Sequence, residues 1–439
     1  MSTSQATLIQ RLSEAIQDYI NESTTTNIGA GVTVISTALN KHDNALDDTF
    51  NNWWVYIKGT ANDCVERKVR DYATATGTLT VYGANLSAES ASVPFELGRY
   101  ERRKKLLAIN RTIEEIYPDL VKLLEDRSLI TGNILPPFRW SSASALELYT
   151  LATGTLAKNT DGAYIWRGKT SAKITASGAD DFLSINSNKY PRLLDLMGKT
   201  ITFKCWVYPE VANDAFLTIY TLKADGTAQT LNSTTACPAG KKTLLELKDQ
   251  SINDDIQFIE FRLGVQTNTK YVYFDEPRVT GRDLYDYLLP SDFDNGHISK
   301  VYIQTSGYSD DICDDLLPRN WERIYGSEFQ TREIGGSLYK HIRLPQLYSS
   351  KRQLKLIGYC PLEALSADTG TISTDNKQAI DLLIAYAAYL LYRMEEGIPA
   401  SKDISRYEQA SSKWLGEYYR LLPNAKMVTP RGTLNLPII

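Results

Sequence analysis

The sequence predicts an α+β multidomain protein in which an all-β sandwich is inserted between two partly helical flanks. From about residue 140 to 281, short segments alternate apolar and polar residues between Gly, Asn and Asp turns, which is typical of sandwich strands. On either side, apolar residues recur at helical spacing, as over 6–22 and 373–397. At 439 residues the chain is long enough for two or three domains.

The N-terminal flank, residues 1–138, is expected to contain both helices and a small β unit. Its predicted elements are a helix at 6–22, strands at 53–59, 64–72 and 77–83, and a helix at 101–124 that Pro118 should kink or split. Basic residues fill 102–105 in the first turns of the second helix, which is unfavourable for the helix dipole unless an acidic neighbour or a phosphate compensates. This run could contact a nucleic-acid backbone, but a solvated helix face is the favoured interpretation.

The insertion, residues 139–282, is predicted to be entirely β. Its strands are expected at 162–168, 171–177, 199–209, 215–226, 242–249, 257–264 and 270–279. The segments LPPFRW (135–140) and DLYDYLLP (283–290) bracket it, so we expect an inserted module whose two ends lie close together.

The C-terminal flank, residues 283–425, is expected to be mixed. Predicted elements are strands at 298–305, 338–344 and 352–360 and helices at 373–397 and 402–421. The first of these helices is apolar nearly all round, so it should be buried, in part by a neighbouring subunit. Residues 426–439, with two prolines and an apolar end, predict an extended arm that needs a surface to pack on.

Composition argues against most enzyme classes. A net charge of −4 gives no global basic field for nucleic acid or an anionic membrane. The five cysteines include no CxxC pair, the three histidines are far apart, and no HExxH, GxSxG, Walker A or GxGxxG sequence occurs. No stretch approaches about 18 uninterrupted apolar residues. The sequence therefore predicts a soluble, non-enzymatic protein made in a reducing compartment.

Aromatic residues are abundant, with 27 Tyr and 7 Trp, and this favours interfaces or strands. Within the insertion, Trp166, Trp206 and Tyr208 are the candidate glycan-binding residues, because an aromatic face packs against the C–H face of a sugar. Alternation along a strand turns about half of its side chains inward, so the competing interpretation makes these residues part of the core.

A metal site is the second candidate within the insertion. Asp275, at the end of the last predicted strand, could bind a structural Ca²⁺ together with Glu147, because hard oxygen ligands suit that ion. The competing interpretation, a turn at the end of a strand, is favoured. No other cofactor is expected.

Two segments of the insertion carry a resemblance to a known fold. LMGKTITFKCWVYPE (196–210), followed by KYVYFDEPRV (270–279), resembles the jelly-roll sandwich of carbohydrate-binding modules. The resemblance implies a jelly roll over about 140 residues. Sugar binding does not follow directly, because many such modules only decorate their host protein.

The flanks carry a second resemblance. FELGRYERRKKLLAINRTIEEIYP (95–118), QLKLIGYCPLEALSADT (353–369), IDLLIAYAAYLLYRM (380–394) and WLGEYYRLLP (414–423) are, in their order, similar to tailed-bacteriophage head–tail connector (adaptor or neck) proteins. This implies a homo-oligomeric ring, often dodecameric, at the head–tail junction of the virion, made in the host cytoplasm. Its partners would be the portal protein, downstream tail or neck proteins, and DNA that passes through without sequence recognition. The implied portal-binding arm contains Pro430, Arg431, Leu434, Leu436, Ile438 and Ile439.

The leading functional hypothesis is therefore a virion connector ring with an outward β-sandwich. The alternative is a carbohydrate-binding adhesin or minor tail protein that recognises a host-surface glycan. A glycan-degrading enzyme is disfavoured, because the rest of the chain leaves no room for the usual catalytic barrel.

Overall fold

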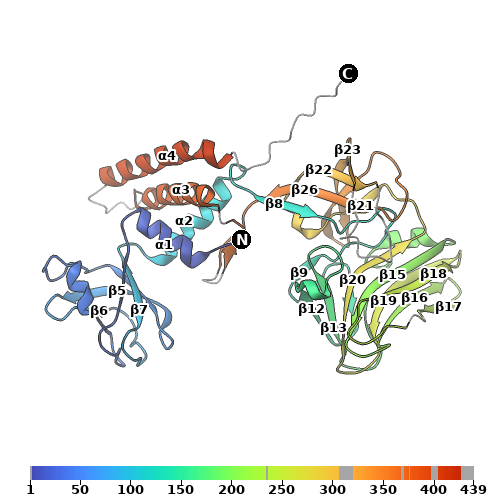
Figure 1. Cartoon of the computed structure of the whole chain (residues 1–439), viewed down its shortest axis with the longest axis horizontal. Coiled ribbons are helices and arrows are strands. Elements are labelled where there is room, and N and C mark those ends of the chain that lie inside the picture. Colours follow the sequence, from blue (N-terminus) through green and yellow to red (C-terminus); the bar gives the residue numbers. More distant parts are fainter. Residues whose placement is uncertain are drawn as a thin grey trace, which may run out of the picture. The chain divides into compact units, whose positions relative to one another are not determined.

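The computed structural model describes residues 2–233, 236–305, 320–366, 370–374, 376–396 and 404–426. The chain forms two compact units: residues 1–122 with 361–439, and residues 123–360 (Figure 1). These divisions differ from the predicted insertion at 139–282. Strands that flank the sandwich in sequence belong to the second unit because they pair with one another: β8 (Lys122–Asp126) lies beside β26 (Leu354–Cys360).

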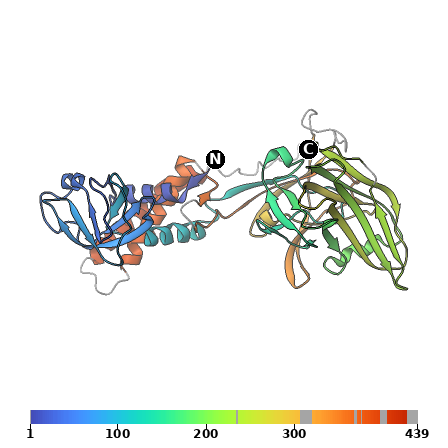
Figure 2. The same cartoon turned by 90° about the horizontal axis from the view of Figure 1, so that it is seen from below.

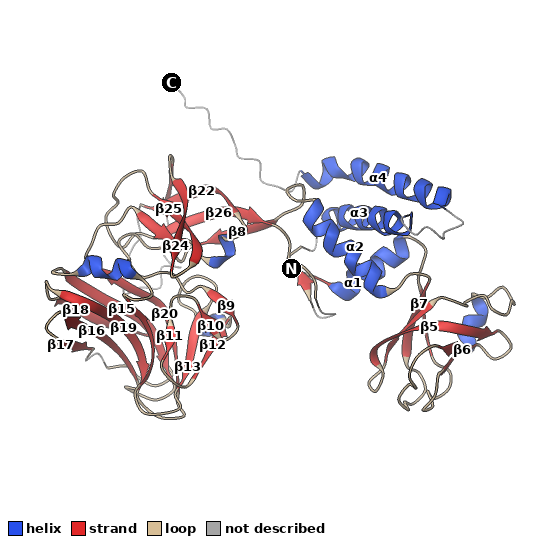
Figure 3. Cartoon of the chain, turned by 180° about the vertical axis from the view of Figure 1, so that it is seen from behind, coloured by secondary structure: helices blue, strands red, loops and turns tan. Residues whose placement is uncertain are grey.

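The first unit contains a helical bundle. Its helices are α1 (Gln5–Ala15), α2 (Arg102–Glu115), α3 (Lys377–Glu396) and α4 (Ile404–Lys426), shown in blue in Figure 3. α3 packs against α1, α2 and α4, and Leu382, Leu383 and Leu391 are fully buried. Within the described residues, the burial of α3 therefore needs no second subunit. None of the described helices is long and apolar enough to cross a membrane.

The two predicted N-terminal helices are shorter than expected. α1 ends before Gln17, whose φ of +57° lies in the left-handed region. α2 ends at Glu115, ahead of Pro118, and the chain continues into β8 instead of a second helical segment.

A six-stranded antiparallel sheet completes the first unit. Its order is β2 (Ile20–Ser23), β7 (Pro94–Gly98), β4 (Trp54–Lys58), β5 (Asp63–Ala73), β6 (Thr78–Val81) and β3 (Thr33–Ile35). The strands predicted at 53–59, 64–72 and 77–83 match β4, β5 and β6. β1 (Thr3–Ser4) pairs with β27 (Thr371–Ile372), which ties the two halves of the discontinuous unit together.

The second unit is built around a β-sandwich of two five-stranded antiparallel sheets (Figure 2). The front sheet has the order β12 (Thr155–Asn159), β13 (Ser171–Thr175), β20 (Tyr271–Thr280), β15 (Thr200–Pro209) and β18 (Thr243–Ser251). The back sheet has the order β11 (Thr150–Leu151), β14 (Asp181–Asn186), β19 (Ile256–Val265), β16 (Ala215–Lys223) and β17 (Ala228–Asn232). The chain is thus mostly β, and the all-β prediction for the insertion is confirmed.

The core of the sandwich lies between the two sheets. Phe203 and Cys205 on β15 and Phe261 on β19 are buried, and the rings of Phe203 and Phe261 meet edge to face at 5.2 Å. Because side chains alternate along a strand, the residues between these inward positions face away from the core. On β15 the outward positions include Trp206 and Tyr208.

Smaller elements complete the second unit. β23 (Trp321–Ile324), β22 (His297–Gln304), β26 and β8 form one sheet, and β21 (Asp286–Leu288), β25 (Ser337–Arg343) and β24 (Glu328–Ile334) form another. β9 (Trp140–Ser142) pairs with β10 (Ala145–Leu146). Short 3-10 turns occur in this unit at Gly162–Tyr164, Pro191–Leu196 and Ser291–Phe293, and in the first unit at Thr37–Lys41.

Candidate functional site

Aromatic side chains gather on the outward face of the front sheet. In the antiparallel register, Tyr208 on β15 lies opposite Tyr273 on β20, and Trp206 lies opposite Asp275. Residues directly opposite each other in such a ladder project to the same side of the sheet. The four side chains therefore share one face, although they come from strands more than 60 residues apart in sequence.

A loop between β12 and β13 covers this face, and we call residues 161–168 the cover segment. The ring of Tyr164 stacks on Tyr273 with centroids 4.1 Å apart and planes at 4°. The ring of Trp166 stacks on Trp206 at 3.7 Å and 24°. Two parallel ring pairs thus lie side by side over the sheet.

The prediction of a strand at 162–168 is wrong, because these residues form the cover segment. The Asp161 carboxylate accepts a hydrogen bond from the Ala163 amide at 2.9 Å and begins a 3-10 turn over Gly162–Tyr164. Gly168 has a φ of +75°, a conformation that favours glycine. The aromatic residues of this segment alternate along the sequence as they would in a strand, but their rings pack on the outer face of the sheet.

The Asp275 carboxylate anchors the cover segment. It accepts hydrogen bonds from the backbone amides of Trp166 and Arg167, the latter at 2.9 Å. Asp275 is only 6% exposed, and burial raises the pKa of its carboxyl group to about 7. Beside it, the buried side chains of Arg167 and Glu276 form an ion pair at 3.1 Å.

The centre of the site contains an unsatisfied hydrogen-bond donor. Trp206 is 8% exposed, and within the described residues its indole Nε1 has no acceptor. A buried donor without a partner carries its full desolvation cost, so this N–H favours any ligand oxygen that reaches it.

The site opens to the surface as a hollow of about 190 Å³. Its lining residues are Tyr164, Trp166, Trp206, Val207, Tyr208, Lys242, Tyr273 and Asp275. The Lys242 ammonium lies 5.7 Å from the Trp166 ring, and the Lys173 ammonium lies 4.2 Å from the Tyr271 ring at the edge of the cluster. Because the hollow is open to solvent and lined by rings, it suits binding of a ligand on a platform rather than its enclosure.

The structure brings together the three residues that the sequence nominated for glycan binding: Trp166, Trp206 and Tyr208 surround one hollow. Sequence reasoning did not identify Lys242, and it did not predict that the rings stack in pairs. It named Asp275 only as a metal ligand, because the pairing of distant strands is not visible in composition. Tyr220, another aromatic residue of the insertion, lies on β16 of the back sheet and takes no part.

The proposed calcium ligands have other partners. Glu147 forms an ion pair with the buried Arg139 at 2.8 Å, and Asp275 accepts the two amides of the cover segment. Among the residues that the structure describes, no group of three or more His, Cys, Asp or Glu side chains could hold a metal ion. The portal-arm residues Pro430, Arg431, Leu434, Leu436, Ile438 and Ile439 lie outside the described residues.

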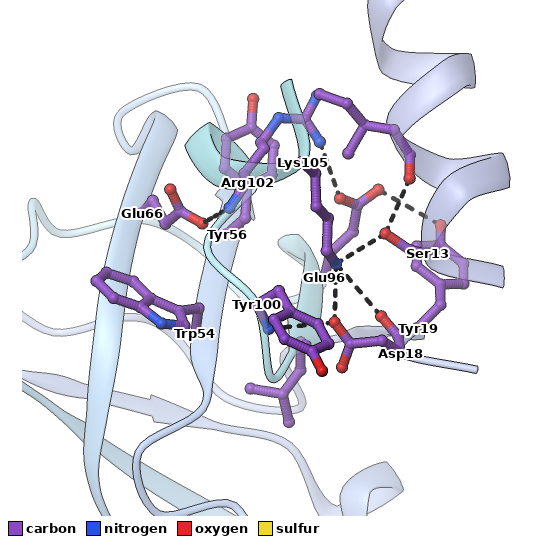
Figure 4. A pocket seen from close by; sticks show the side chains of 13 residues that line it. Ser13, Asp18, Tyr19, Trp54, Tyr56, Glu66, Glu96, Tyr100, Arg102 and Lys105 are labelled. Carbon is purple, nitrogen blue, oxygen red and sulfur yellow. Dashed lines mark hydrogen bonds and ion pairs between the residues drawn. The ribbon is translucent and has the colours of Figure 1, made fainter. Parts of the chain in front are cut away.

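A second, polar cavity of about 290 Å³ lies in the first unit, between the helices and the six-stranded sheet (Figure 4). The basic residues at the start of α2 are compensated here by acidic side chains. The Glu66 carboxylate accepts a hydrogen bond from the Arg102 amide at 2.7 Å, and the Arg102 guanidinium forms an ion pair with Glu96 at 3.1 Å. Burial raises the pKa of Glu66.

The same compensation extends along the basic run. Lys105 forms an ion pair with Asp18 at 3.0 Å, and Lys104 forms one with Glu395 at 2.7 Å. The acidic neighbours that the dipole of α2 requires beside its basic first turn are therefore present within the chain. These charges hold the unit together, and they are a poor candidate for a nucleic-acid contact.

No protein-family model matches the chain, and no curated protein matches it by sequence. Solved structures similar to part of it include the C-terminal family 22 carbohydrate-binding module of Clostridium thermocellum Xyn10B, at 15% identity and a TM-score of 0.29, over 34% of this chain and 93% of that one. The family 22 xylan-binding domain of Paenibacillus barcinonensis Xyn10C is 14% identical, with a TM-score of 0.26, over 37% and 95%. The enzymatically active domain of bacteriophage CBA120 tailspike protein 4 is 14% identical, with a TM-score of 0.25, over 31% and 19%.

Proposed function

We propose that the protein is a carbohydrate-binding adhesin or minor tail protein whose β-sandwich recognises a host-surface glycan. The observation that carries this proposal is the gathering of Trp166, Trp206 and Tyr208 around one hollow on the outward face of the front sheet. Side chains that served only the core would point between the two sheets, as Phe203 does.

The chemistry of the hollow fits a neutral sugar ring. The C–H face of a sugar packs against aromatic faces, and its hydroxyl groups offer oxygen acceptors. The free Nε1–H of Trp206 needs such an acceptor, and the Lys242 ammonium is a second donor at the rim. We propose binding without turnover, because the acidic group in the hollow, Asp275, is already engaged by two backbone amides.

A glycan array with the full chain tests this proposal. We expect signals for one class of glycan, and we expect Trp206→Ala and Tyr208→Ala each to reduce them at least tenfold. Tyr220→Ala is the matched control, because it removes an aromatic side chain from the back sheet of the same sandwich. Thermal unfolding of each variant shows whether the fold is kept. An array without signals, or equal losses in all three variants, would contradict the proposal.

A virion connector ring is the second candidate function, and it concerns the first unit. The observation that favours it is that residues 1–122 and 361–439 form one compact unit, as expected for a host interrupted by an inserted module. In this proposal the unit assembles into a ring on the portal at the head–tail junction, contacts tail or neck proteins, and lets DNA pass through. The sandwich would project outward, so the two proposals are compatible.

Oligomeric state tests the connector proposal. Native mass spectrometry at rising protein concentration should show a closed ring, and binding to a purified portal ring should be lost when residues 427–439 are deleted. A chain that stays monomeric at high concentration and does not bind the portal would rule out the connector.

A further inference from the structure

We infer that the sugar binds directly on the faces of Trp206 and Tyr273, and that the cover segment swings away to admit it. The inference deepens the proposed glycan-binding function, on which it depends. It assigns the floor of the site, rather than the rings now at its surface, as the platform that recognises the ligand. The cover segment then acts as an internal competitor.

The covering rings occupy the place that a sugar ring would take. Trp166 lies on Trp206 and Tyr164 lies on Tyr273, with ring centroids 3.7 Å and 4.1 Å apart. Stacked rings at this spacing are in van der Waals contact, with planes at 4° for the tyrosine pair and 24° for the tryptophan pair. A sugar ring cannot reach either floor ring until its cover moves.

The cover segment is held by its two ring stacks and by polar contacts that water or a ligand can replace. Residues 161–170 are exposed or half-buried, apart from the Arg167 side chain, which is 7% exposed in its ion pair, whereas Trp206, Tyr273 and Asp275 beneath them are buried. The contacts that fix it are the two amides on Asp275, the Arg167–Glu276 ion pair and a hydrogen bond from Lys242 Nζ to the Ile165 carbonyl at 2.9 Å. No apolar residue of the segment is itself buried, so we expect it to open at a lower free-energy cost than the strands beneath it.

Glycines flank the two covering rings and can serve as hinges. Gly168 has a φ of +75°, and a side chain built there would meet only Ser128. A side chain at Gly162 would meet nothing within 4 Å. Open space around flexible residues at both ends lets the segment move without displacing the sheet.

With the cover segment in place, two polar groups of the site are cut off from water. The Nε1 of Trp206 has no acceptor among the described residues, and burial of Asp275 raises the pKa of that carboxyl group to about 7. Both are consequences of excluding water. When the segment opens, a sugar hydroxyl can accept a hydrogen bond from the indole N–H, and water can replace the two backbone amides on the Asp275 carboxylate.

Binding affinities measured by calorimetry, with xylohexaose and cellohexaose as probes, show whether the Trp166 ring covers the site or forms the platform that binds the sugar. If Trp166 is a cover, Trp166→Ala should bind a probe at least threefold more tightly than the natural chain, because the competing ring is gone. Trp206→Ala should weaken the same binding at least tenfold, and Tyr220→Ala should leave it unchanged. If Trp166→Ala weakens binding as much as Trp206→Ala does, the outer rings are the platform and the inference is overturned.

Amide hydrogen exchange without ligand provides an independent test. The amides of Trp166 and Arg167 should exchange at least a hundredfold faster than that of Phe274 in β20, and a bound probe should speed them further. Exchange as slow as that of Phe274 would overturn the inference even if sugars bind. If no probe binds to the natural chain or to Trp166→Ala, the proposed glycan-binding function itself fails for these sugars, and the inference falls with it.

Discussion

The Asp275 carboxylate on β20 accepts a hydrogen bond from the backbone amide of Arg167 at 2.9 Å. This bond links two residues that are 108 positions apart in sequence. The charged and titratable groups around this carboxylate are Glu276 and Arg278 on β20, Cys205 on β15, Arg167 in the cover segment and Lys242 before β18. Loss of hydration is the largest influence on Asp275 and outweighs its two hydrogen bonds, so burial raises its pKa to about 7. Proton binding by Asp275 is therefore coupled to folding.

This coupling predicts that Asp275 makes the protein less stable as the pH rises. Between its ordinary pKa of 3.8 and the folded value of about 7, the folded chain holds a proton that the unfolded chain has lost. The stabilising contribution of Asp275 to the free energy of unfolding is thus fully present below about pH 4. It decreases by roughly 1.4 kcal/mol per pH unit as the pH rises, and it is lost above about pH 7.

Asp275→Asn measures this contribution, because an amide oxygen still accepts the backbone N–H groups and does not titrate. Denaturant unfolding gives the free energy of unfolding of the variant minus that of the natural chain. This difference should be about 2–3 kcal/mol larger at pH 8 than at pH 5. Asp225→Asn is the control, because this exposed carboxylate has a pKa held below its ordinary value by hydrogen bonds from Thr227. Parallel pH profiles for Asp275→Asn and the natural chain would contradict the assignment.

Most of the strands could be predicted from the sequence because the pattern that specifies them is local. Segments 199–209 and 257–264 alternate cleanly and match β15 and β19, which supply Phe203 and Phe261 to the core. The cover segment carries a similar alternation, yet it has no strand partner. Whether an aromatic segment pairs in a sheet or stacks on one depends on distant residues, here Asp275 and Trp206.

The candidate site was predictable in its residue types and not in its arrangement. Trp166, Trp206 and Tyr208 were identified because their rings suit sugar binding. The role of Asp275 depends on amides more than 100 residues away, and the division of the two units depends on the pairing of β8 with β26. Such long-range pairing leaves no mark in the spacing of residues along the chain.

The start of α2 provides a second prediction. Glu66 on β5 accepts the amide of Arg102, which is one of the unpaired N–H groups at the helix terminus. Glu66→Ala leaves this partly buried amide without the carboxylate that accepts its hydrogen bond, and it removes a negative charge near a basic first turn. We expect a loss of about 1–3 kcal/mol in the free energy of unfolding.

Urea unfolding checks this prediction, with Glu114→Ala as the control. Glu114 lies on the exposed side of the same helix, and its replacement should change the free energy of unfolding by less than about 0.5 kcal/mol. Equal effects of the two substitutions would show that the Glu66 contact does not stabilise the helix.

Two adjacent lysines of α2 provide a final prediction. Lys104 and Lys105 both form ion pairs with carboxylates, but the two pairs differ in how deeply they are buried. Lys105 and Asp18 are both buried, whereas the side chain of Lys104 is 41% exposed beside Glu395. Lys105→Met leaves the Asp18 carboxylate buried without its cation and should destabilise the first unit by about 3–5 kcal/mol. Lys104→Met should cost no more than about 1 kcal/mol, because solvent screens that pair.

Salt dependence distinguishes the two pairs further. High salt should narrow the difference between Lys104→Met and the natural chain, since ions screen an exposed pair, and should leave the Lys105→Met difference nearly unchanged. Guanidinium chloride would itself screen charges, so urea unfolding with and without 1 M NaCl is the suitable measurement. A Lys105→Met variant as stable as Lys104→Met would mean that Asp18 is satisfied by the amides of Arg99 and Tyr100 alone. The lysine would then be dispensable to the polar cavity of the first unit.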